Sequence, residues 1–172
     1  MVDHLTKDKR SWNMRQIKSR HTKPEVLVRS LLHRAGFRFK INDKKLPGKP
    51  DIVLPKYKTV IFVHGCFWHR HPNCPKATKP KTNTDYWENK FKKNILRDKK
   101  IQEDLKKLNW RIILVWECEI LSNPISVISN IINQLTADGK KKYKNDLSPK
   151  ELLRLAEQRS KFLTEKELNN EK

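Results

Sequence analysis

The sequence predicts an α/β fold in which helices pack around a sheet. Two continuous apolar segments, residues 59–64 and 110–117, are predicted strands, and the first is expected at the centre of the sheet. Between them, residues 85–108 place apolar side chains at helical spacing along a long polar stretch. The order strand, long helix, strand favours a right-handed crossover and therefore parallel pairing of the two strands.

Length and charge limit the kind of protein this can be. A chain of 172 residues can bury one stable core, and a formal net charge of +20 indicates a polyanionic partner. No run approaches the roughly 18 apolar residues of a membrane span, and no apolar signal segment follows Met1. We therefore expect a cytoplasmic protein with no membrane partner. The odd number of cysteines, 3, favours metal binding or free thiols over disulfides.

Two helices are predicted before the first strand. Residues 11–20 form a short basic helix that Trp12 or Met14 could anchor. The stretch Thr22-Lys23-Pro24-Glu25 is a capping box with proline in the first turn, so a second helix is expected to begin there. Gly36 is placed to end that helix, because glycine readily takes the left-handed conformation that follows many helix C-termini.

Two short strands are predicted between the second helix and the central strand. Residues 37–41 alternate apolar and basic side chains, as a half-buried strand does. Residues 51–54 form a short apolar run after the turn at Pro47-Gly48. We expect both segments to pair into the sheet.

The C-terminal half is predicted to be mainly helical. The inner stripe of the helix at 85–108 is expected to consist of Trp87, Phe91, Ile95, Ile101, Leu105 and Leu108. Residues 124–135 form a mostly apolar helix, residues 139–146 form a basic linker, and another capping box opens a final amphipathic helix. We therefore expect a main domain at 1–138 and a helical extension at 139–172.

The cysteines and one histidine have the composition of a closed structural zinc site. Cys66, Cys74 and the distant Cys118 together with a histidine make a Cys₃His set. Cys66 follows one predicted strand and Cys118 ends another, so the two meet if those strands are neighbours. Spacing alone does not choose between His69 and His71 as the fourth ligand. Three unrelated buried cysteines are the alternative.

A magnesium site is the second candidate. Asp51 begins a predicted strand, and the next strand ends at His64. A carboxylate facing a polar group on the adjacent strand commonly holds magnesium against a phosphate. Each residue also has a simpler interpretation: Pro-Asp is a common turn, Glu25 is explained by its capping box, and His64 could be a hydrogen-bonded strand-end histidine.

Phe67 and Trp68 are neighbours in a strongly basic chain. Adjacent residues of an extended strand cannot both face the core, so at least one is expected to be exposed. An exposed aromatic side chain in a basic protein could stack on a nucleic-acid base. Core packing of both rings is the alternative.

Seven motifs, in order along about residues 7–135, resemble the very short patch repair DNA mismatch endonucleases. They are W-N-M-R at 12–15, T-x-x-E at 22–25, P-G-K-P-D at 47–51, V-I-F-V-H-G-C-F-W-H-x-H at 60–71, Y-W-x-x-K at 86–90, K-N-x-x-R-D at 93–98 and N-W-R-x-x-x-V-W-E-C at 109–118. The segment H-G-C-F-W-H is the most specific of them. The extension from Gly139 has no counterpart in this resemblance.

The resemblance implies a fold and an activity. The fold would be a restriction-endonuclease-like α/β core, with a central mixed sheet flanked by helices and a structural zinc clasp. Members of the family nick double-stranded DNA on the 5′ side of the thymine in a T:G mismatch, which arises when 5-methylcytosine deaminates. A monomeric, nucleoid-associated enzyme is expected, with other repair proteins as possible partners.

The resemblance also implies a role for each site residue. Asp51 and the backbone carbonyl of Val63 would bind magnesium, His69 would assist proton transfer, Glu25 would orient metal-bound water or His69, and His64 would lie beside the scissile phosphate. The zinc ligands would be Cys66, His71, Cys74 and Cys118. The aromatic wedge at the mismatch would consist of Phe67, Trp68 and Trp87, met by Met14. The family commonly has threonine at position 63, so any role of that hydroxyl is lost here.

Two other functions fit the same residues. A restriction endonuclease of similar fold would be a dimer that breaks both strands of an intact site. A zinc-stabilised DNA-binding module without catalysis would bind through the +20 charge alone and would need no magnesium.

Overall fold

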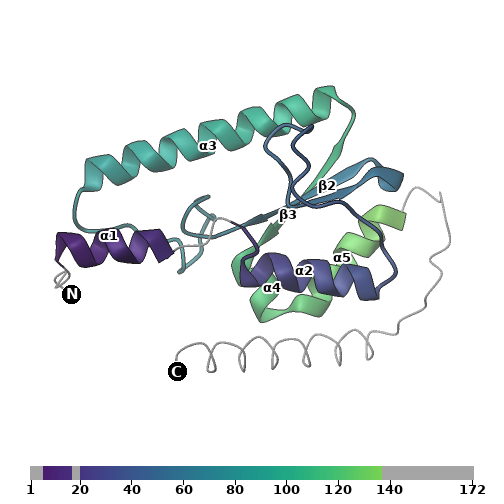
Figure 1. The fold of residues 1–172 in the computed structure, drawn as a ribbon, viewed down its shortest axis with the longest axis horizontal. Helices are drawn as coiled ribbons and strands as arrows, with labels where there is room; N and C mark the ends of the chain where they lie inside the picture. The colour runs from purple at the N-terminus through teal and green to yellow at the C-terminus, as the bar shows by residue number, and fades with distance from the viewer. Residues whose placement is uncertain (1–5, 17–19, 137–172) are drawn as a thin grey trace.

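The computed structural model describes residues 6–16 and 20–136 of the chain (Figure 1). The first helix, α1, is described over Lys7–Gln16 and so begins earlier than the predicted 11–20, while residues 17–19 of that prediction lie outside the described residues. The predicted linker and final helix lie outside the described residues. None of the described helices is both long enough and apolar enough to cross a membrane.

The sheet has three strands in the order β1-β2-β3, with β2 in the centre as predicted. Its strands are β1 (Ile52–Leu54), β2 (Thr59–His64) and β3 (Arg111–Trp116). β1 pairs antiparallel with β2, while β2 and β3 pair in parallel and are joined through the long helix α3 (Thr84–Lys107). The sheet is therefore mixed, and the parallel pairing expected from the strand, helix, strand order is confirmed.

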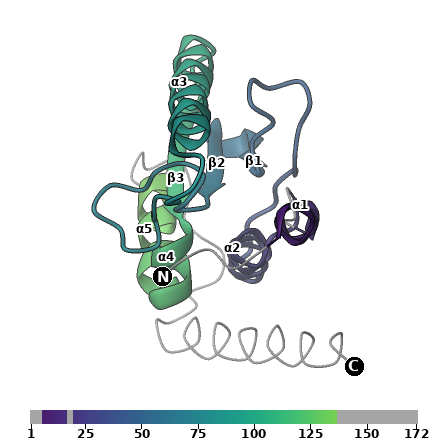
Figure 2. The same cartoon turned by 90° about the vertical axis from the view of Figure 1, so that its left-hand side faces the viewer.

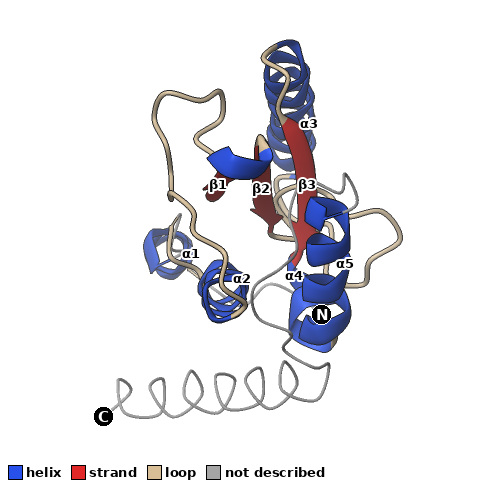
Figure 3. Cartoon of the chain, turned by 90° about the vertical axis from the view of Figure 1, so that its right-hand side faces the viewer, coloured by secondary structure: helices blue, strands red, loops and turns tan. Residues whose placement is uncertain are grey.

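Helices cover both faces of this sheet. α3 lies on one side, and three further helices lie on the opposite side (Figures 1 and 3). Those three are α2 (Lys23–Arg34), α4 (Glu117–Ser122) and α5 (Pro124–Thr136). Successive residues of β2 point alternately into two cores: Ile61 packs against α2 and α5, whereas Val60 and Phe62 pack beneath α3. Burial on both faces explains the continuous apolar run of this strand.

The predicted strand at 37–41 is wrong. Only Lys40 pairs with the sheet, through two 2.8 Å backbone hydrogen bonds with Val53. Phe37 is buried because its ring packs 5.4 Å from that of Tyr57. Phe37 is buried and Phe39 is half-buried, but Ile41 is 45% exposed, and the backbone does not continue into a strand ladder.

The strand and helix predictions in the second half need smaller corrections. β3 is an edge strand, so Leu114 is 37% exposed and the segment is only partly buried. The helix α4 was not predicted, and Glu117 begins it instead of ending the strand. The inner stripe of α3 is narrower than expected, because Ile95 is 47% exposed and Leu108, which follows the helix as its C-cap, is 50% exposed. In the view nearly along α3, this helix lies on one side of the strands and α2, α4 and α5 lie on the other (Figure 2).

Candidate active site and metal cluster

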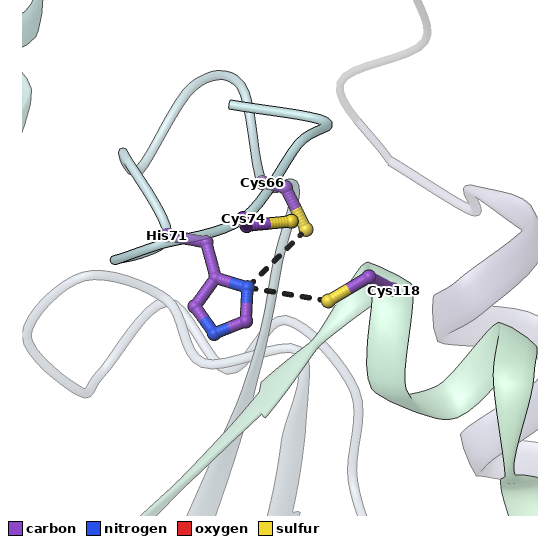
Figure 4. Close-up of side chains that lie close together, drawn as sticks. All are labelled: Cys66, His71, Cys74 and Cys118. Atoms are coloured by element: carbon purple, nitrogen blue, oxygen red, sulfur yellow. Dashed lines mark hydrogen bonds between the residues drawn. The ribbon is translucent and has the colours of Figure 1, made fainter. Parts of the chain in front are cut away.

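A cluster of three thiols and one imidazole forms where β2 and β3 end (Figure 4). Cys66 follows β2, and Cys118 lies in the first turn of α4, directly after β3. Because the two strands are parallel, their carboxyl ends meet at one edge of the sheet and bring the two cysteines together. The loop after β2 adds His71 and Cys74, and one ligand atom from each of the four residues lies within 4.8 Å of the others.

His71, and not His69, joins the cysteines. Its Nδ1 atom lies 3.2 Å from the sulfur of Cys118 and 3.8 Å from that of Cys66. The imidazole also stacks on Trp116, with ring centroids 4.2 Å apart, which fixes its plane. The alternative of three unrelated cysteines is therefore excluded by the geometry.

The donor set of this cluster suits zinc. Three sulfurs and one nitrogen are a usual set of ligands for a closed tetrahedral zinc site. Burial raises the pKa of the Cys66 thiol to about 12, so that thiol stays protonated unless a cation stabilises its thiolate. The four residues could hold a zinc ion, and such a site would tie the loop after β2 to α4.

An open cleft of about 930 Å³ lies beside this cluster, and Asp51 faces it. The Asp51 carboxylate precedes β1 and accepts a 2.8 Å hydrogen bond from the backbone N–H of Val63 on β2. Burial raises the pKa of Asp51 to about 6, although the Val63 hydrogen bond acts in the opposite direction. The predicted arrangement, a carboxylate facing the adjacent strand, is present, and its oxygens could hold a hard cation such as magnesium.

Two histidines and one aspartate form a second group in the cleft. His64 is buried at the end of β2 and stacks on His69, with ring centroids 3.8 Å apart. The Nδ1 atom of His69 lies 2.5 Å from Oδ2 of Asp98 on α3. Burial, helped by the charge of His69, lowers the pKa of His64 to about 4, so its ring is neutral at pH 7. The arrangement leaves His69 oriented by a carboxylate, as general acid–base histidines commonly are.

Asp98 is a site residue that sequence reasoning missed. Burial acts to raise its pKa, but the hydrogen bond and charge of His69 and the neighbouring Arg97 hold that pKa below its usual value. Asp98 is therefore an anion beside His69. It was part of the motif at 93–98, but nothing in the sequence separates it from the other charged residues of α3. Its contact with His69 is what identifies it.

Glu25 also lines the cleft, and its capping-box explanation is incomplete. Thr22 is the N-cap of α2 but makes no side-chain cap to the helix backbone. Instead its hydroxyl donates a 2.8 Å hydrogen bond to Oε1 of Glu25, while the backbone N–H of His21 donates to Oε2 at 2.9 Å. Glu25 is only 4% exposed, and its carboxylate is held at both oxygens with a defined orientation.

The aromatic residues form one group beside the cleft. The ring of Phe67 lies 5.0 Å from Trp68 and 5.3 Å from Trp87, and Trp68 itself lines the cleft. Phe67, Trp68 and Trp87 are all half-buried. The expectation that at least one of Phe67 and Trp68 is exposed is wrong, because this segment is a turn and not an extended strand, closed by the hydrogen bond from the N–H of His69 to the carbonyl of Gly65. Met14 lies in α1, and its side chain is outside the described part of the structure.

The fold and the site together are typical of a hydrolase whose cleft could hold a metal ion. A carboxylate and an oriented histidine share a cleft, and the Cys₃His cluster adjoins it through Gly65 and Glu117, which line the cleft next to Cys66 and Cys118. Comparison with known proteins narrows this class to one family. Residues 2–76 match the family described as DNA mismatch endonuclease Vsr.

Curated relatives give the same result over most of the chain. The chain is 53% identical over 125 residues to the "Type II nicking enzyme V.NmeAIP" of Neisseria meningitidis, covering 73% of this chain and 89% of the relative. It is 46% identical over 120 residues to the "Type II nicking enzyme V.XorIIP" of Xanthomonas oryzae, covering 70% and 88%. The "DNA mismatch endonuclease Vsr" of Escherichia coli is 44% identical over 120 residues, covering 70% and 76%. The chain belongs to the Vsr family of DNA mismatch endonucleases.

Proposed function

We propose that this protein nicks one strand of double-stranded DNA on the 5′ side of the thymine in a T:G mismatch, as the first cut of very short patch repair. The observation that carries the proposal is the cleft in which Asp51 and the His69–Asp98 pair lie together, next to the aromatic group. The family membership and the relatives named as nicking enzymes support it. The three-stranded mixed sheet would then be the centre of a restriction-endonuclease-like core.

Two metal ions belong to this proposal. Asp51 and the backbone carbonyl of Val63 would hold magnesium, which when bound neutralises phosphate charge and lowers the pKa of coordinated water. Cys66, His71, Cys74 and Cys118 would hold zinc. The zinc site has a purely structural task, because all four positions around the metal are then filled by protein.

The protein's own residues divide the chemistry between them. His69 donates its Nδ1–H to Asp98, which leaves Nε2 as the atom that accepts a proton from the attacking water. Glu25 orients that water or His69. His64, neutral at pH 7 and stacked on His69, lies beside the scissile phosphate and can donate a hydrogen bond to it.

Replacement of His69 by alanine is expected to slow nicking by about 10²–10⁴-fold, because the proton acceptor is lost. Asp98→Asn should slow nicking less, since the His69 imidazole remains and loses only the negative charge that orients it and stabilises its protonated form. Single-turnover nicking of a T:G duplex at saturating protein measures both. His33→Ala, an exposed histidine on α2, is the control. Wild-type rates in His69→Ala would exclude His69 from proton transfer.

Recognition of the mismatch is assigned to the aromatic group, and overall affinity to the basic surface. Insertion of a ring between base pairs costs a few kcal/mol for unstacking and returns roughly 1–3 kcal/mol per stacked aromatic side chain. A mismatched pair is easier to open, so the wedge favours it. Phosphate contacts of the lysine and arginine surface add affinity to any sequence.

Trp68→Ala is therefore expected to narrow the difference in binding free energy between T:G and matched duplexes by roughly 1–3 kcal/mol. The steep salt dependence of binding should not change, because no phosphate contact is removed. Equilibrium binding to both duplexes at several salt concentrations measures this. Trp110→Ala is the matched control, because Trp110 precedes β3 and so lies at the opposite end of the parallel strands. Equal weakening of both duplexes would assign Trp68 a packing role instead.

A nicking assay on T:G, C:G and A:T duplexes, with and without added Mg²⁺, tests the whole proposal. Cleavage of one strand, only in the T:G duplex and only with Mg²⁺, is the expected result. Breaks in both strands of an intact site would indicate a restriction endonuclease, and binding without cleavage would indicate a DNA-binding module. Size-exclusion chromatography checks the expectation that the protein acts as a monomer.

A further inference from the structure

Arg29 differs from the other cations of the described chain. It is 9% exposed, and among the residues that the structure describes no other lysine or arginine is buried. It lies on α2 one turn after Glu25, which is 4% exposed. Removing two charges from water costs several kcal/mol per ion, so a buried pair of this kind is poorly explained by fold stability alone.

The guanidinium of Arg29 makes three directed contacts. Its Nε–H donates to the backbone carbonyl of Glu25 at 3.1 Å, and its Nη2 lies 3.4 Å from Oε2 of the same residue. Its Nη1 lies 3.3 Å from Nδ1 of His21, and because arginine has only donors, that ring nitrogen accepts. A planar fork bound at three points has one orientation, which the single ammonium group of lysine cannot reproduce.

These contacts place Arg29 on the side of the Glu25 carboxylate that faces away from the cleft. Glu25, Thr22 and Asp51 line the cleft, whereas Arg29 is not among the residues that line it. Arg29 can therefore influence the chemistry only through Glu25 or through its charge. With the contacts from Thr22 and His21, both oxygens of the Glu25 carboxylate have partners, and its orientation beside the cleft is fixed.

The positive charge of Arg29 also acts on the two carboxylates of the cleft. Glu25 and Asp51 are two carboxylates of one cleft, and the charges of Glu25 and Arg29 both reach Asp51 with opposite effect. Without Arg29 the two anions would repel each other in a poorly solvated site. The described structure offers no other buried lysine or arginine to offset them.

We propose that Arg29 is a positioning residue of the active site, which fixes the Glu25 carboxylate and offsets the negative charge that Glu25 and Asp51 share. This inference rests on the proposed nicking function, because it assigns Arg29 a task in that reaction through Glu25. Arg29 touches neither DNA nor metal in this assignment.

A double-mutant cycle separates this role from a merely structural one. Arg29→Met and Glu25→Gln should each lower kcat for nicking of a T:G duplex by about 10–100-fold, as residues that orient a catalytic group usually do. The double variant should be no slower than the slower single variant, because Arg29 acts through Glu25. KM for the duplex should stay within about threefold, since affinity comes from phosphate contacts elsewhere. Arg29→Lys should recover part of the rate, because it keeps the charge.

Controls make each outcome decisive. Arg34→Met removes the same charge from an exposed position of α2 and should leave kcat unchanged. Thermal unfolding and zinc content are measured for every variant, and if Arg29→Met does not fold, the cycle is run with Arg29→Lys. If the reductions in kcat of the two single variants multiply in the double variant, Arg29 does not act through Glu25. If Arg29→Met lowers the melting temperature and leaves kcat unchanged, its role is only structural. Either result would overturn the inference while the nicking function stands. Absence of nicking by the wild-type protein would overturn both.

Discussion

Asp51→Asn is expected to reduce Mg²⁺-dependent nicking of a T:G duplex below detection while leaving affinity for DNA within about threefold. The substitution keeps an oxygen for the Val63 N–H and removes only the charge that would hold the metal against the phosphate. DNA affinity should persist, because many phosphate contacts share it. Single-turnover nicking and equilibrium binding on one duplex measure the two effects. Asp104→Asn, which removes a carboxylate from the far end of α3, is the control. Nicking at the wild-type rate would remove Asp51 from the site.

The same residue gives the reaction a pH dependence with a defined sign. Burial raises the pKa of Asp51 to about 6, so protons compete with Mg²⁺ for this carboxylate below that pH. The Mg²⁺ concentration that gives half of the maximal rate should rise as the pH falls from 7 to about 5, and should change little above 7. A constant Mg²⁺ requirement down to pH 5 would contradict this.

In the absence of Mg²⁺, raising the pH should lower the folding stability of the wild-type protein, although it favours Mg²⁺ binding. The folded protein binds the Asp51 proton more tightly than the unfolded chain does, because the pKa is raised from 3.8 to about 6 on folding. Wild-type stability is therefore lost as the pH rises through this window, and Asp51→Asn has no such loss. The variant should melt above the wild-type protein at pH 8 and close to it at pH 4. This thermal measurement also establishes that an inactive variant is folded.

Some parts of the fold could be predicted because the sequence carries their physical cause. The apolar run of β2 is continuous because both faces of that strand are buried, and the apolar spacing of α3 reflects its contact with the sheet through Leu105. Residues 37–41 have an equally good pattern, yet only Lys40 pairs. The alternation matches the burial of Phe37 and Phe39 but not the exposure of Ile41, and pairing needs a partner strand that the pattern does not contain.

The sequence likewise identifies some residues of the site and not others. Asp51, Cys66 and Cys118 could be placed at strand ends, because the strands themselves were predictable. The choice of His71 over His69 depends on the turn that follows Cys66, which sends one ring to the thiols and the other to Asp98. Asp98 and Arg29 could not be chosen, because only contacts between separate elements distinguish them from the many other charged residues of the chain.

Loss of one zinc ligand should have the largest effect on folding. Wild-type protein is expected to carry one zinc per chain, and Cys118→Ser should lose most of it and melt at a clearly lower temperature. Apparent zinc binding contributes about 10–16 kcal/mol in small zinc domains at pH 7, so weakening it by one thiolate removes several kcal/mol. Cys118 matters most because it is the ligand that comes from α4, whereas the other three follow β2 within one loop.

Three measurements on the same samples decide this prediction. Elemental analysis gives the zinc content, and thermal unfolding with and without a chelator gives the stability. The chelator should destabilise the wild-type protein and have little effect on Cys118→Ser. Glu103→Gln is the control, because it removes a carboxylate from an exposed position of α3, away from the four ligands. Because burial raises the pKa of the Cys66 thiol, zinc uptake must release protons and should strengthen as the pH rises. Active, folded wild-type protein without zinc would show that hydrogen bonding among the thiols and His71 is enough to hold this wall of the cleft.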